Sequence, residues 1–297
     1  MAAIIKKELR AYFNSWIGYI FLFILVGLVG VFFWQINLGA QIGDFQFTLG
    51  SLPIFLLVLI PVLTMRLFAE EARQKTDQLL FTAPVTVSSV VLAKFFSAVL
   101  LVCIALAITV IFPFMLSFFG ELPYSQIFAV YIGFVLLVPC FIAVGMFISA
   151  CTENQIIAAV ITFFVMIFLY IMENIVHFIN DSVTASQAIG SSALISLIFI
   201  AVVIAVLAYI IYDSTKNYYI AGGLALILIS VSTGVYAYDP SIFDVMLVRG
   251  TQWLSIMTRF DNFNNGVLNV SDIIYYITFA GIFVYLTINV IEKRRWK

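Results

Sequence analysis

Charge is scarce in this sequence, and several familiar catalytic patterns are missing from it. Only 10% of the residues are charged, and His177 is the one histidine. The chain has no HExxH pair for a metalloprotease zinc site and no Gly-x-x-x-x-Gly-Lys-Ser/Thr loop for a nucleotide phosphate. We therefore expect a chain that is not an enzyme and that binds no ATP, magnesium or other cofactor by itself.

Cysteine is scarce as well. The three cysteines, Cys103, Cys140 and Cys151, are scattered within or at the ends of apolar runs, and no two of them form a CxxC pair. This pattern is typical of small apolar packing residues and not of a disulfide or a metal site. We expect no nucleic-acid partner either.

Apolar residues make up 64% of the chain, far above their share in a soluble domain. One aqueous core cannot bury that much apolar surface, and the runs approach the roughly 20 residues that cross a bilayer as a helix. The sequence therefore predicts an all-α integral membrane protein. The third predicted span is long enough to tilt, or to break at Pro113. The eight predicted spans, or six if the sixth and seventh are misread, cover residues 16–36, 50–68, 91–118, 126–151, 156–178, 192–212, 218–237 and 272–291.

The distribution of basic residues tests this topology independently, because basic flanks stay cytoplasmic. With both termini cytoplasmic, only Arg249 and Arg259 fall on the outer side. The outer loops also collect carboxylates, among them Asp44, Asp261 and Asp272, which we interpret as solvated loop residues. The inner side holds every other basic residue, namely Lys6, Lys7, Arg10, Arg66, Arg73, Lys75, Lys94, Lys216, Lys293, Arg294, Arg295 and Lys297.

Residues 1–15 precede the first span and have a helical pattern. Apolar side chains recur on one face of the segment from Ala2 to Phe13, which predicts an amphipathic helix in the inner headgroup region. The apolar run from Trp16 to Gln35 is longer than the roughly 7–15 residues of a signal-peptide core, so we expect this terminus to be retained. The apolar face holds Ile5, Leu9, Tyr12 and Phe13, and the other face holds Lys6, Lys7 and Arg10.

Glu173, Asn174 and His177 form a polar cluster near the outer end of the fifth predicted span. Ionisable groups within a span are costly, so they are site candidates by default. Glu173 and His177 share a helix face at a spacing of i, i+4. Two interpretations stay open. The cluster lines a translocation path or acts as a proton-linked switch, or it sits at the headgroup level and is satisfied by water.

The stretch from Arg66 to Lys94 is a charged, helix-prone segment between the second and third predicted spans. From Glu70 to Leu80 it is too polar to enter the bilayer, yet apolar residues interleave with the charges at helical spacing. Pro84 disfavours helix at the residue before it, so the segment is expected to bend there. A solvated linker does not need this pattern. We therefore expect the cytoplasmic segment 69–90 to dock on a partner.

Three stretches of the chain are similar to one known family. Residues 70–94 resemble the cytoplasmic segment after the second span in permeases of the type-2 ABC exporter superfamily, in the sequence EEARQKTDQLLFTAPVTVSSVVLAK. Residues 6–21 and 259–296 are similar to the two ends of its gliding-motility-type branch, in the sequences KKELRAYFNSWIGYIF and RFDNFNNGVLNVSDIIYYITFAGIFVYLTINVIEKRRW. The resemblance covers essentially the whole chain.

The resemblance implies a complex of two transmembrane subunits and two separate ABC ATPase subunits, which bind the ATP and magnesium. The segment after the second span would be the coupling helix that docks in a groove of the ATPase. Lys75 stands where the family often has glycine, which leaves the local turn geometry open. The outer segment 238–271 would form short interfacial helices, with room for a lid or an auxiliary membrane protein. The implied coupling residues are Glu70, Glu71, Arg73, Thr76, Leu79, Leu80 and Pro84, with Lys94 marking the return into the membrane.

We therefore expect residues 1–297 to form a single permease domain in a bacterial cytoplasmic membrane. Its expected function is to form the path of an ATP-driven exporter, beside a second copy of the permease or a homologue. Two alternatives stay open. An ion-coupled secondary transporter or channel would rely on Glu173 and His177, and a membrane scaffold of a motility or envelope complex would need no transport. The sequence does not indicate a substrate.

Overall fold

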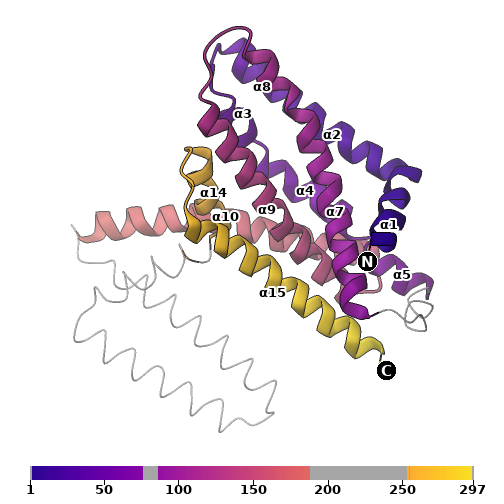
Figure 1. Ribbon diagram of the computed structural model, residues 1–297. Coiled ribbons are helices and arrows are strands. Elements are labelled where there is room, and N and C mark those ends of the chain that lie inside the picture. Colours follow the sequence, from indigo (N-terminus) through magenta and orange to yellow (C-terminus); the bar gives the residue numbers. More distant parts are fainter. Residues whose placement is uncertain (1, 76–85, 188–252, 254, 296–297) are drawn as a thin grey trace. The chain divides into compact units, whose positions relative to one another are not determined.

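The computed structural model describes residues 2–75, 86–187, 253 and 255–295 (Figure 1). The chain divides into two compact units, Met1–Tyr170 with Ile256–Lys297 and Ile171–Ser255, and each is described by itself. Most of the second unit lies outside the described residues. The predicted spans 192–212 and 218–237 fall there.

All regular structure in the described residues is helical. The first unit begins with α1, α2, a π-helical segment η1, the short α3 and α4, and it closes with α14 and α15. Its bounds in chain order are α1 (Ala2–Asn14), α2 (Trp16–Phe32), η1 (Phe33–Gly39), α3 (Gln46–Gly50), α4 (Pro53–Thr64), α5 (Ala69–Gln74), α7 (Val87–Thr109), α8 (Ile111–Leu116), α9 (Tyr124–Cys151), the start of α10 (Gln155–Gln187), α14 (Ile256–Asn264) and α15 (Val270–Arg295).

Six stretches of the described chain are long and apolar enough to cross a membrane. The prediction of an all-α integral membrane protein is therefore confirmed. Each of the six corresponds to one of the eight spans predicted from the sequence, and the other two predicted spans are those outside the described residues. The six stretches are Gly18–Gly39, Pro53–Gln74, Val87–Leu116, Tyr124–Cys151, Gln155–Met172 and Val270–Arg294.

α9 forms the centre of the first unit. It packs against α4, α7, α14 and α15 (Figure 1). Most of its side chains are buried. A helix that is apolar all round either faces lipid or is covered by other helices, and α9 is covered for most of its length. Two glycines permit the close approach, since a Cβ at Gly133 would lie 2.7 Å from Phe263 Cβ of α14, and one at Gly145 would clash with Thr64 of α4.

The long third span breaks near Pro113, which is one of the two alternatives that the sequence leaves open. α7 ends at Thr109 and α8 begins at Ile111, so the interruption precedes the proline by a few residues. Proline has no N–H to bond the carbonyl of Thr109 one turn earlier, which weakens the helix at this point. The Thr109 hydroxyl donates to the Leu106 carbonyl, with an Oγ1 to oxygen distance of 2.7 Å. The Tyr131 hydroxyl of α9 lies 3.1 Å from Thr109 Oγ1.

The contact at Gly145 gives a test of the packing between α4 and α9. We expect Gly145→Ala to lower the free energy of unfolding by about 1–3 kcal/mol, because the added methyl group must displace the buried Thr64. Gly27→Ala is the matched control, since a Cβ at Gly27 would meet no heavy atom within 4 Å. Thermal unfolding of both variants in detergent measures the difference, and equal midpoints would contradict the close approach.

Candidate functional site around Lys94

α5 begins immediately after the α4 span and is held by a hydroxyl from a distant part of the chain. Its first residues, Phe68 and Ala69, are buried, and no side chain of the segment itself caps the helix. Instead, Ser149 Oγ of α9 accepts hydrogen bonds from the backbone N–H groups of both residues, at 3.2 and 3.1 Å. The same hydroxyl donates to the Met65 carbonyl at 3.2 Å. α9 therefore fixes the start of α5.

Lys94 lies in the second turn of α7, and its side chain is 3% exposed. Its Nζ donates to the carbonyl of Leu67 and to Glu71 Oε1, both at 2.7 Å. It also forms an ion pair with Glu8 Oε1 of α1 at 3.7 Å, and it lies 5.1 Å from the ring centre of Phe68. One ammonium group thus joins α1, the connection between α4 and α5, α5 itself and α7.

The physical requirement behind this arrangement is that a buried ammonium must be compensated. Burying an unpaired charge is very costly, so Lys94 is stable at this depth only with its carbonyl and carboxylate partners in place. Tyr12 lies one helical turn from Glu8 on the same side of α1. Burial, followed by the charge of Glu8, raises the pKa of the Tyr12 hydroxyl above its usual value, so that side chain stays neutral.

The predicted coupling residues on α5 point in two directions. Glu71 faces inward and binds Lys94. Glu70 is half-buried, lies 3.9 Å from Arg66 Nε and accepts a hydrogen bond from Gln74 at 3.3 Å. Arg73 is exposed. α5 therefore uses one carboxylate to hold itself to the bundle and presents its last turn outward.

Lys75 settles the turn geometry that the sequence leaves open. It ends α5 with φ 55° and ψ 22°, in the left-handed region, and its N–H bonds back to the Ala72 carbonyl at 3.2 Å. Glycine adopts this conformation without strain, whereas another residue pays about 1 kcal/mol or more. The resemblance places a glycine at this position in the family, and the lysine here adopts the conformation that a glycine would favour.

The structure does not test the other predicted site residues. Thr76, Leu79, Leu80 and Pro84 lie outside the described residues. The backbone of α10 is helical through Glu173, Asn174 and His177, and the side chain of Asn174 is exposed. The side chains of Glu173 and His177 also lie outside the description, so their role stays a prediction.

A second ion pair joins α14 to α15, and it corrects one expectation. Asp272 is 4% exposed, so its interpretation as a solvated loop carboxylate is wrong. Its Oδ1 accepts from Arg259 at 2.8 Å and its Oδ2 from Asn262 at 2.9 Å. The Arg259 guanidinium also lies 4.0 Å from the ring centre of Tyr275. Asp272 sits in the first turn of α15, where the helix dipole favours a negative charge.

Sequence reasoning did not pair Lys94 with Glu8, nor Arg259 with Asp272. The signal available was weak: a lysine inside an apolar helix and an arginine followed by a carboxylate on the next helix. Neither pattern identifies the partner, because the partner is chosen by helix packing.

Known families provide an independent comparison. A family model described as ABC-2 family transporter protein matches residues 2–190. The chain belongs to this family. The match includes α1, α5 and α7, and with them Glu8, Glu71 and Lys94. No curated protein matches the chain.

Membership makes this ABC-2 protein a multi-pass membrane permease subunit of an ABC transporter. Such subunits are generally not enzymes, and the family implies partnership with an ABC ATPase. The resemblance to permeases of this type, inferred from three stretches of sequence, is confirmed at this level.

Lys94 gives the sharpest test of the site. We expect Lys94→Met to lower the free energy of unfolding by about 3 kcal/mol or more, because it leaves Glu8 and Glu71 without the buried cation that compensates them. Arg73→Met is the control, since it removes an exposed cation of the same segment. Thermal unfolding in detergent measures the difference. Equal midpoints for the two variants would contradict the network.

The ion pair between Arg259 and Asp272 gives a separate prediction. Asp272→Asn removes the charge that binds Arg259 and Asn262, and we expect a loss of about 1.5–3 kcal/mol, the usual contribution of hydrogen bonds to a charged group. Glu121→Gln neutralises an exposed carboxylate and should change the midpoint little. If Asp272→Asn unfolds at the wild-type temperature, the pair does not hold α14 on α15.

Proposed function

We propose that this ABC-2 permease is the transmembrane subunit of an ATP-driven exporter, and that α5 with the residues after it docks on the separate ATPase. The observation that carries the proposal is the Lys94 network. It connects α5, the element that would meet the ATPase, to α1 and α7, while Ser149 connects it to α9.

The network suggests how motion would pass from the partner to the spans. A bound partner shifts a two-state protein only through a difference in affinity for the two states. If nucleotide closes the ATPase subunits and displaces α5, Glu71 and the Leu67 carbonyl must either carry Lys94 with them or leave its ammonium unpaired. The second outcome is costly, so α7 and α1 would follow α5.

The orientation supports the same proposal. The Lys94 contacts place α1 and α5 at one end of the unit, and both carry exposed basic residues. α15 packs on α7 and ends at that side with Lys293 and Arg294 (Figure 1). Basic residues favour the cytoplasmic side. Both termini would then be cytoplasmic, in the plasma membrane of a bacterium.

The finer assignments also belong to this proposal. Two ATPase copies and a second permease, identical or homologous, would complete the complex. The sequences of residues 6–21 and 259–296 favour the gliding-motility-type branch. α14 would belong to the outer segment, where an auxiliary membrane protein would dock. In the described part of that segment, α14 buries Ile256, Met257, Phe260 and Phe263, so its apolar side is already covered.

Association with the ATPase is the measurement that tests docking. One variant, Arg73→Glu, reverses an exposed charge on α5. A second variant replaces both Leu79 and Leu80 by Asp, which places carboxylates in the apolar edge predicted after α5. We expect each change to reduce the co-purified ATPase and its permease-dependent activity by about tenfold or more, because like charges and buried carboxylates oppose a fitted interface.

Lys293→Glu is the matched control, since it reverses an exposed charge on α15, outside the predicted coupling segment. Unchanged association of the α5 variants would refute the docking site. Transport into vesicles that persists without nucleotide, and that is lost in Glu173→Gln, would instead support the ion-coupled alternative.

A further inference from the structure

α1 meets α2 at a tight corner. Ser15 breaks the helix with extended backbone, and its hydroxyl donates to the Tyr12 carbonyl at 3.1 Å. A Cβ at Gly18 would lie 2.5 Å from the same carbonyl oxygen, so glycine permits the close approach. α1 is therefore held at a fixed angle to the first span.

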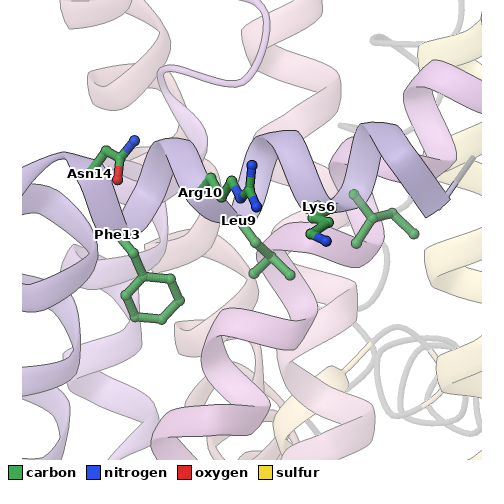
Figure 2. A pocket seen from close by; sticks show the side chains of 6 residues that line it. Lys6, Leu9, Arg10, Phe13 and Asn14 are labelled. Carbon is green, nitrogen blue, oxygen red and sulfur yellow. The ribbon is translucent and has the colours of Figure 1, made fainter.

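Two neighbouring rows of side chains on α1 form an open groove of about 410 Å³. The first row is apolar and half-buried, and it consists of Ile5, Leu9 and Phe13. The second row is polar and exposed. Figure 2 shows Leu9 and Phe13 pointing to the same side of the helix. The polar row consists of Lys6, Arg10 and Asn14.

The opposite side of α1 is already occupied. Glu8 faces Lys94 of α7, and α1 packs along α7 and α2. The residues that line the groove lie on a different side of the helix from Glu8. Binding in the groove therefore leaves the Lys94 network in place. Among the described residues, no carboxylate forms an ion pair with Lys6 or Arg10.

Exposed aromatic residues mark the depth of this groove in the membrane. Trp16 is 81% exposed and Tyr19 is 56% exposed, at the start of α2 just past the corner. Tryptophan and tyrosine in such positions lie at the headgroup level. α1 adjoins this level, and so its cations meet headgroups while its apolar row meets the upper part of the acyl chains.

We propose that the α1 groove binds a phospholipid with an anionic headgroup. The Lys6 ammonium and the Arg10 guanidinium bind the phosphate and the headgroup charge, since guanidinium pairs with phosphate through two parallel N–H donors. Asn14 supplies a further amide donor. Ile5, Leu9 and Phe13 contact the acyl chain. The combination of two cations with an apolar row fits a charged lipid better than a free phosphate, which would leave the apolar row bare.

Single-charge variants separate this site from diffuse attraction to the membrane. Lys6→Gln and Arg10→Gln each remove one cation from the groove. Lys7→Gln removes an adjacent exposed cation that does not line it. Leu9→Trp fills the groove without any change of charge. All four positions are at the surface of α1, and a thermal midpoint for each variant verifies that it is folded.

The experiment uses the full chain in nanodiscs of equal parts phosphatidylcholine and phosphatidylglycerol. After transfer to detergent, native mass spectrometry measures how much of each lipid stays bound. For Lys6→Gln and Arg10→Gln we expect retained phosphatidylglycerol to fall about tenfold, the factor that corresponds to about 1.4 kcal/mol, because each variant loses a charged hydrogen-bond donor to the phosphate. Leu9→Trp should fall similarly, and Lys7→Gln, which does not line the groove, by less than about twofold.

Three outcomes would overturn the proposal. Equal losses in Lys6→Gln and Lys7→Gln would mean that only the net charge of α1 matters. Equal retention of the two lipids by the wild type would remove the requirement for an anionic headgroup. Unchanged retention in every variant would leave the groove to a different occupant, such as a protein partner. The assay contains no ATPase or nucleotide, so its result is independent of the docking proposed for α5.

Discussion

One end of this permease, the end that holds α1 and α5, depends on a buried ammonium group. Lys94 cannot reach water, so its position is stable only where an oxygen-rich shell is assembled around it. That shell comes from three segments that are far apart in the sequence: Glu8 from α1, the Leu67 carbonyl after α4, and Glu71 from α5. The three oxygens share one ammonium group, so α1, α5 and α7 are joined at a single point.

The other end of the unit is also held by an ion pair. Arg259 of α14 and Asp272 of α15 form a short, buried pair that keeps α14 against α9 and α15. Between the two ends, α9 contributes no ionised side chain. Its Gly133 contacts α14 and its Ser149 contacts α5, and the intervening residues span about 24 Å at the helical rise of 1.5 Å per residue. Polar interactions therefore determine how the ends are arranged, while apolar packing fills the centre.

The polar contacts at the end with α1 and α5 also determine how α5 is ordered. α5 is short and would be marginal alone, because a helix of one or two turns gains little from its own hydrogen bonds. Its order comes from Ser149, Lys94 and the left-handed turn at Lys75. α1 meets the same network through Glu8 on one side and carries the groove lined by Lys6 and Arg10 on another. A partner that binds α5 and a lipid that binds α1 would thus act on elements joined by one cation.

Much of this architecture follows from the sequence alone. Inside a bilayer every backbone group must be bonded within its own segment, so a long apolar run specifies a helix without reference to the rest of the chain. The spans are predictable for that local reason. α1 is predictable from the helical spacing of its apolar residues, and a break near Pro113 from the missing proline N–H. The partners of Lys94 and Asp272 are not. Charged residues can meet only after the helices have packed, and the sequence separation between Glu8 and Lys94 carries no information about that meeting. The class of protein was thus determined by the sequence, whereas the ion pairs, the anchoring of α5 by Ser149 and the strained turn at Lys75 were decided by the tertiary structure, because each depends on a neighbour that only helix packing brings into reach.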